Sequence, residues 1–203
     1  MTSDVFVIGK GHSSYRIYNL EELHQAGVRI WLFDNEPLDS AEKKLVYKYY
    51  SVDFEGNAAQ QAASFAKEFE VPPVDFGICY IESLIPWSAE WFSHLGVKFL
   101  SPAEAQKVRS KYQMRAAFAH AGMRTPRYFR GTPSQLLDTE LEFPVVVKPE
   151  YGYSSIGVEL ICDARELSVY FKRDNNVRSD TYIVEGQVTR AEHCTETNRN
   201  ILA

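Results

Sequence analysis

The sequence predicts an α/β fold in two parts, and three features lead to this prediction. Short apolar runs alternate with helical patterns over residues 1–100, an order typical of a parallel sheet covered by helices. A helix start at residues 101–104 interrupts the alternation. Farther along, an apolar strand ending at Lys148 leads into a Gly/Ser-rich loop over residues 150–157, which indicates a second, α+β part.

The first part has the elements of a parallel βαβ layer. Helical spacing of apolar residues predicts a helix that ends near Gly27, followed by helices over residues 57–70 and 83–95. Short apolar runs between these patterns predict strands over residues 4–8, 29–33, 47–52, 76–80 and 97–100.

The turn after the first strand leaves a dinucleotide site open as an alternative. It reads Gly9-x-Gly11-x-x-Ser14, and Asp34 ends the next strand. However, the third glycine of the dinucleotide fingerprint is missing, and Asp34 could equally cap the following turn.

Helix-capping motifs mark where the first part of the chain ends and the second begins. Ser101-Pro-Ala-Glu104 begins one helix, and Ser110-Lys-Tyr-Gln113 begins another that ends at Gly122. Further helices are expected after Thr132 and from Asp163, with strands over residues 127–129, 143–149, 158–162 and 181–184. The domain boundary therefore lies within residues 101–126, and we place it between a domain at 1–106 and a domain at 107–203.

Composition excludes several classes of protein. Of the 203 residues, 45% are hydrophobic and 24% charged, which is ordinary for a soluble domain. No apolar run approaches the roughly 18 residues of a membrane helix, and the N-terminus has no basic secretory region. The three separated cysteines form no CxxC pair. They predict reduced thiols in a cytoplasmic setting and no zinc site, with Cys79 and Cys162 in the core.

One cationic segment lies within an acidic protein of net charge −5. Residues 107–130 hold seven Lys or Arg side chains and no acidic one. A solvated helix face is one interpretation. Contact with a polyanion is the other, and the overall acidity then favours a small phosphorylated ligand over nucleic acid.

The stretch from Phe143 to Val158 has the composition of a phosphate site. Its glycines and serines offer backbone N–H groups at close range, and Lys148 adds a cation on a flexible stem. A β-hairpin with a Gly/Ser turn and a chance lysine gives the same local pattern, so the stretch alone leaves both interpretations open.

Five motifs follow one another along the second half of the chain. They are Ser-Lys111 at a helix start, Ala-Gly122-x-x-Thr-Pro126, Phe-Pro-x-x-x-Lys148-Pro, Gly152-x-Ser-Ser-x-Gly157-Val, and Val184-Glu185-x-x-Val188 with Glu192. Taken in this order, they resemble the motifs of the ATP-grasp superfamily, and most of all those of its carboxylate–amine ligases, the L-amino acid ligases. The resemblance implies a pre-ATP-grasp α/β domain over residues 1–106 and an ATP-grasp nucleotide-binding domain, incomplete at its C-terminus, over residues 107–203.

The same resemblance implies an ATP site and the role of each of its residues. Lys111 would be the first ATP lysine, and Lys148 would reach the α and β phosphates. The lid over the triphosphate would contain Tyr153, Ser154, Ser155 and Gly157. Glu185, Gly186 and Val188 would form the adenine hinge, and Glu192 would bind the ribose. The resemblance assigns no catalytic residue within this chain.

Mg²⁺ would accompany ATP, but the metal ligands of the family follow well beyond the hinge. Glu196-x-Asn198 has their spelling and lies too close to Glu192, so no metal ligand is expected in this chain. The chain would then be a fragment of a longer ligase or a naturally short relative, inactive by itself.

The implied reaction of the whole enzyme forms an amide or peptide bond through an acyl phosphate. Its partners would be ATP, a small carboxylate and an amine, with no nucleic acid and no membrane, and the resemblance leaves room for a homodimer. Two alternatives stay open. One is a non-catalytic nucleotide-binding or partner-binding domain, and the other is a dinucleotide-dependent oxidoreductase.

Overall fold

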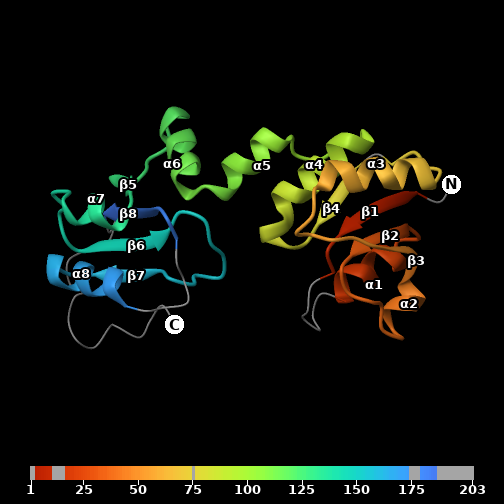
Figure 1. Cartoon of the computed structure of the whole chain (residues 1–203), viewed down its shortest axis with the longest axis horizontal. Helices are drawn as coiled ribbons and strands as arrows, with labels where there is room; N and C mark the ends of the chain where they lie inside the picture. The colour runs from red at the N-terminus through yellow and green to blue at the C-terminus, as the bar shows by residue number, and fades with distance from the viewer. Residues whose placement is uncertain (1–2, 11–16, 75, 174–178, 187–203) are drawn as a thin grey trace. The chain divides into compact units, whose positions relative to one another are not determined.

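The computed structural model describes residues 3–10, 17–74, 76–173 and 179–186 (Figure 1). Its contacts divide the chain into two compact units, residues 1–106 and residues 107–203. Over the described residues, none of the helices is both long and apolar enough to cross a membrane.

The first unit is built around a sheet whose strands are parallel, as the sequence predicts, and the sheet has four strands in the order β3-β2-β1-β4. The strands are β1 (Asp4–Ile8), β2 (Arg29–Asp34), β3 (Val46–Ser51) and β4 (Gly77–Cys79). They are joined by α1 (Ile17–Gln25), α2 (Glu42–Leu45), α3 (Ala58–Glu68), the 3₁₀ turn η2 (Glu82–Leu84) and α4 (Ile85–Leu95).

Both faces of this sheet are buried, which explains why its central strands are apolar without alternation. Val5 and Val7 of β1 pack with Leu20 of α1 on one face. On the other face, Phe6 of β1 belongs to an aromatic cluster with Trp91 of α4. Gly77 allows close packing there, because a Cβ at this position would lie 2.3 Å from the ring of Phe92.

The fifth strand expected over residues 97–100 is not formed. A single parallel bridge joins Lys98 to Phe76, and the Gly77 N–H donates to the Lys98 carbonyl at 3.0 Å. The chain turns away at once to begin α5 (Pro102–Arg109), so no ladder can extend.

The expectation for the cysteines is also wrong in part. Cys79 is a reduced thiol of intermediate burial, and its Sγ donates to the Ile81 carbonyl at 3.2 Å. Cys162 is disulfide-bonded and likewise only partly buried. Three reduced thiols, with two of them in the core, are therefore not what the structure contains. A sequence with widely separated cysteines carries no signal for such a pairing.

The second unit contains an antiparallel sheet of order β5-β8-β6-β7. Its strands are β5 (Tyr128–Gly131), β6 (Val145–Pro149), β7 (Glu159–Ile161) and β8 (Tyr182–Gly186). The helices are α6 (Lys111–His120), α7 (Pro133–Leu137) and α8 (Ala164–Lys172). The caps predicted at Ser110 and Asp163 are present, because each side chain accepts a backbone N–H at the start of its helix. Thr132 caps α7 in the same way.

The two faces of the second sheet differ in chemistry. On one face, Val145 and Val147 of β6 pack with Leu136 of α7 and Leu167 of α8. Side chains alternate along a strand, so Lys148 and Glu185 lie on the opposite face. The register places Lys148 opposite Ile183 and Glu185 opposite both Val146 and Tyr128. We call this opposite side the polar face; it also carries Arg130.

Candidate functional site

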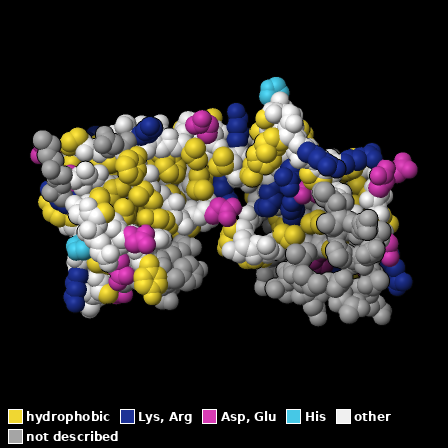
Figure 2. All heavy atoms as spheres, turned by 180° about the vertical axis from the view of Figure 1, so that it is seen from behind, with side chains coloured by type: hydrophobic (Ala, Val, Ile, Leu, Met, Phe, Trp, Pro, Cys, Tyr) yellow, Lys and Arg dark blue, Asp and Glu magenta, His cyan; other side chains and the backbone are white. Residues whose placement is uncertain are grey.

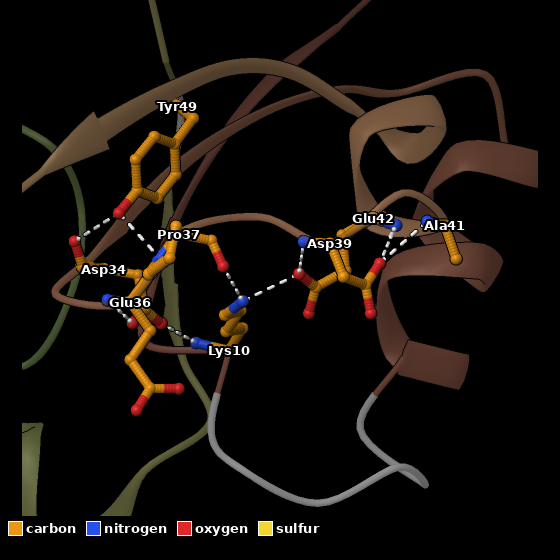
Figure 3. A network of polar contacts seen from close by, with 8 residues as sticks. All are labelled: Lys10, Asp34, Glu36, Pro37, Asp39, Ala41, Glu42 and Tyr49. Atoms are coloured by element: carbon orange, nitrogen blue, oxygen red, sulfur yellow. Dashed lines mark hydrogen bonds and ion pairs between the residues drawn. The ribbon is translucent and has the colours of Figure 1, made fainter.

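Asp34, the acid at the end of β2 that a dinucleotide site would require, is not available to a ligand. Asp34 is 2% exposed, and its carboxylate accepts the backbone N–H groups of Lys10 and Glu36 (Figure 3). The Lys10 ammonium donates to the Pro37 carbonyl at 2.8 Å and to the Glu42 carboxylate at 2.7 Å. Both Asp34 oxygens therefore hold backbone N–H groups, one after β1 and one in the turn after β2. This agrees with the capping role that the sequence analysis gives as the alternative to a dinucleotide site.

The centre of the polar face is a carboxylate held between two cations. The Lys148 ammonium donates to Glu185 Oε2 at 2.6 Å. Arg115, on α6, donates through Nε to Glu185 Oε1 at 2.6 Å and through a terminal nitrogen to Oε2 at 3.1 Å. The side chain of Glu185 is 7% exposed, that of Lys148 is 15% exposed and that of Arg115 is 29% exposed. The strand lysine and the hinge glutamate predicted from sequence are thus in direct contact.

A second carboxylate lies one step beyond the end of β6. Glu150 is 1% exposed, and its Oε1 accepts the Ser110 hydroxyl at 2.6 Å. Its Oε2 accepts Arg130 Nε at 2.7 Å and the Thr181 hydroxyl at 2.6 Å. Each donor comes from a different segment, so Glu150 connects the start of α6, strand β5 and the entry to β8.

Lys111 extends toward the Gly/Ser loop. Its ammonium lies 3.2 Å from the Gly152 carbonyl and 3.4 Å from the Glu150 carbonyl. Lys111 and Arg115 are four residues apart on α6 and therefore share one side of the helix. This spacing brings two cations from α6 to the same polar face that carries Lys148.

The loop over residues 150–157 has an unusual backbone. Ser154 and Ser155 have φ angles of 51° and 57°, and Gly157 has a φ of 74°. Non-glycine residues rarely adopt the left-handed region, and such residues gather at functional sites. The Tyr170 hydroxyl of α8 donates to the Gly157 carbonyl at 2.7 Å and anchors the end of the loop. Tyr153 is 54% exposed, so the loop presents its side chains to solvent.

Both buried carboxylates of the polar face are charged at neutral pH. Burial raises the pKa of Glu185, but hydrogen bonds from Arg115 and Lys148, together with their charges, hold it below its usual value. Burial likewise raises the pKa of Glu150, and hydrogen bonds from Ser110, Thr181 and Arg130 outweigh it, so the pKa is again lowered. The two carboxylates therefore neutralise part of the positive charge that Lys111, Arg115, Arg130 and Lys148 bring to the polar face.

Acidification is expected to destabilise the second unit. The lowered pKa values mean that the unfolded chain binds protons to Glu150 and Glu185 more readily than the folded one. Their stabilisation is complete above the ordinary glutamate pKa of 4.5 and is lost as the pH falls below it through the folded-state values. The loss of stability is measured by the protection of the β6 and β8 amides against hydrogen exchange, compared between pH 7 and pH 3. Glu185→Gln should show a shallower dependence, and an unchanged dependence would contradict the assignment.

The structure brings together only part of the site predicted from sequence. Lys111, Lys148, Glu185 and the 152–157 loop lie in the second unit as described above. Gly186 ends β8, and its N–H donates to the Arg127 carbonyl at 2.8 Å. Val188 and Glu192 lie outside the described residues, as does the Glu196-x-Asn198 spelling. In the described ranges, His, Cys, Asp and Glu side chains form no group of three that could hold a metal.

Sequence reasoning missed three residues of the polar face: Arg115, Arg130 and Glu150. Arg115 could have been found, because it follows Lys111 by one helical turn. Arg130 belongs to the cationic segment over residues 107–130, but the register of β5 against β8 decides on which face of the sheet its side chain lies. Glu150 stands in a loop, where no periodicity predicts burial. Dark blue Lys and Arg side chains gather on the face of the second unit seen in Figure 2.

Comparison of the sequence with known proteins finds similarity over part of the chain. No family model matches it. Alanine–anticapsin ligase of Bacillus subtilis strain 168 is 34% identical over 98 residues, which cover 47% of this chain and 21% of that ligase. The same ligase of Bacillus amyloliquefaciens is 33% identical over 97 residues, covering 46% of this chain and 21% of that ligase.

Solved structures are similar over almost the whole chain. L-amino acid ligase of Bacillus licheniformis has a TM-score of 0.72 at 20% identity, covering 92% of this chain and 44% of that one. Carboxyaminoimidazole ribonucleotide synthase of Aspergillus clavatus, complexed with ATP, has a TM-score of 0.67 at 14% identity, covering 92% and 48%. The chain thus matches about half the length of these structures, and its sequence match covers about a fifth of the curated relatives.

Proposed function

We propose, from the premise that this chain has the fold of one half of an ATP-grasp ligase, that its residues 107–203 bind the phosphates of ATP. Residues 1–106 would be the pre-ATP-grasp domain of the same enzyme. The whole protein would be a carboxylate–amine ligase, by analogy with the ligases that it resembles in sequence and fold. The boundary between residues 106 and 107 follows the division into compact units.

The observation that carries this proposal is the Lys148–Glu185 contact on the polar face. A lysine at the end of a strand is held at 2.6 Å by an acid of the neighbouring strand. Arg115, Arg130 and Lys111 add three more cations from α6 and β5. Such a surface suits a polyanion, because several positive side chains can each contact a different phosphate of the same ligand.

The residues present fit ATP in the chemistry of their donors. Lys148 and Lys111 are flexible cations that can reach phosphate oxygens. Ser154 and Ser155 are exposed and have left-handed backbone conformations, and successive N–H groups in tight turns are a common cradle for anions. Tyr153, Gly157, Gly186, Val188 and Glu192 complete the proposed site, the last two from outside the described residues. ATP would supply the phosphoryl group that activates a carboxylate.

In the whole protein, the proposed reaction is amide formation from a small carboxylate and an amine, driven by ATP with Mg²⁺. The chain's own contribution would be to hold the nucleotide and to neutralise its charge. The Mg²⁺ ligands, the carboxylate site and the amine site are proposed to lie elsewhere in the protein. A non-catalytic nucleotide-binding role would need the same polar face, and the Asp34 contacts speak against a dinucleotide cofactor.

Titration of the chain with Mg-ATP tests the proposal. Binding is expected to slow amide exchange in the second unit, at β6, β8 and the 152–157 loop, and to appear as heat in calorimetry. NADH under the same conditions is the control for a dinucleotide site and is expected to change neither readout. Absence of any ATP-dependent change at millimolar concentration would overturn the proposed function.

A further inference from the structure

Glu150 is a buried acid for which the proposed phosphate contacts give no role. It follows β6 directly, two residues after Lys148, and its carboxylate accepts one hydrogen bond from each of Ser110, Arg130 and Thr181. An ionised carboxylate that is 1% exposed is costly unless its oxygens are satisfied. Three donors at 2.6 to 2.7 Å satisfy them here.

The backbone of Glu150 contacts Lys111, the residue that follows Ser110 at the start of α6. Its carbonyl accepts the Lys111 N–H at 3.3 Å and lies 3.4 Å from the Lys111 ammonium. Its own N–H donates to the Thr181 carbonyl at 3.1 Å. Glu150 therefore holds Ser110 through its side chain and Lys111 through its backbone, while β8 holds Glu150.

These contacts matter because α6 buries little apolar surface, with Tyr112 packing edge-on against the Tyr128 ring of β5 as its aromatic contact. None of its residues, Lys111 to His120, is fully buried, so apolar burial fixes its position less firmly than it fixes most helices, and polar contacts at its N-terminus carry more of that task. The N-cap Ser110 is fully buried. Its hydroxyl accepts the Gln113 N–H at 3.1 Å and donates to Glu150. A carboxylate next to the N-terminus of a helix also interacts favourably with the helix dipole.

We propose that Glu150 is a positioning residue for Lys111. It fixes the first turn of α6 to the end of β6, so that the Lys111 ammonium stays beside Gly152 at the start of the Gly/Ser loop. The inference rests on the proposed function, because it assigns Lys111 to the nucleotide. It adds a residue that reaches the ligand only through another side chain.

Glu150→Gln tests the inference, because glutamine keeps the volume and one acceptor oxygen but loses the charge. ATP affinity is expected to fall about tenfold, in line with the loss of a charge-assisted hydrogen bond. Without nucleotide, exchange of the Gln113 and Met114 amides in the first turn of α6 should become faster. Glu159→Gln is the matched control, since Glu159 is an acid of the same unit that pairs with Arg173 at the surface. It should leave affinity and exchange unchanged.

A double-mutant cycle separates positioning from a general loss of stability. If Glu150 acts through Lys111, the double variant Lys111→Ala/Glu150→Gln binds ATP no more weakly than Lys111→Ala alone. Independent, multiplying losses would overturn the inference, as would an unchanged affinity in Glu150→Gln. Should circular dichroism show that Glu150→Gln does not fold, Ser110→Ala replaces it in the same cycle.

Failure of the proposed function has a different signature. A wild-type chain that binds no ATP overturns both proposals, because Lys111 then has no ligand to be positioned for. A wild-type chain that binds ATP, while Glu150→Gln binds equally well, overturns the inference alone.

Discussion

Lys148→Ala is expected to abolish most of the ATP binding that we propose for this chain. The lysine ammonium is the cation at the end of β6, and its side chain is 15% exposed. Loss of one charge-assisted contact to a phosphate corresponds to roughly 1.5–3 kcal/mol, or about ten- to a hundredfold in affinity. Calorimetric titration with Mg-ATP measures the change directly.

The fold should survive this substitution. Glu185 keeps two hydrogen bonds from Arg115 when Lys148 is removed, so the buried acid is not left unpaired. Lys172→Ala is the matched control, because Lys172 is an exposed lysine of the same unit at the end of α8, and it should bind ATP as the wild type does. A folded Lys148→Ala chain with wild-type affinity would remove Lys148 from the site.

Glu185→Leu is expected to cause the largest loss of stability in the second unit. It removes the anion between Lys148 and Arg115 and leaves two cations facing each other on a partly buried surface. Removing one partner of a buried ion pair costs about 3 kcal/mol or more. Urea unfolding followed by the exchange of β6 and β8 amides measures the loss. Tryptophan fluorescence reports on the first unit in parallel, because Trp31, Trp87 and Trp91 all belong to it.

A second substitution shows whether unpaired charge is the cause. In Lys148→Met/Glu185→Leu, one of the two facing cations is also gone, so part of the lost stability should return. If the double variant is less stable than Glu185→Leu by the full cost of Lys148→Met, packing rather than charge explains the effect.

Most elements of the fold follow from local sequence. The apolar strands of the first sheet, the Ser110 and Asp163 caps and the stop at Gly96 depend on neighbours within a few residues. The strand expected over residues 97–100 was wrong, because an apolar run does not say whether a neighbouring strand is in reach. A single bridge at Lys98 is all that forms.

The candidate site divides in the same way. The motif order predicted that Lys111, Lys148, Glu185 and the Gly/Ser loop belong to one site, and spacing on α6 could have added Arg115. No pattern in the sequence shows that the ammonium of Lys148 meets the carboxylate of Glu185. Residues 37 positions apart become neighbours only through the antiparallel pairing of β6 with β8.

By itself, the sequence determined the order of most elements, the caps at Ser110 and Asp163 and the cationic segment over residues 107–130, because these depend on local periodicity and composition. Only the tertiary structure decided which charges face each other. The β6–β8 register places Lys148 diagonally across from Glu185, within hydrogen-bond reach, and the position of α6 brings the Ser110 hydroxyl to the buried carboxylate of Glu150. Such contacts are fixed by the packing of distant segments, which local sequence does not encode residue by residue.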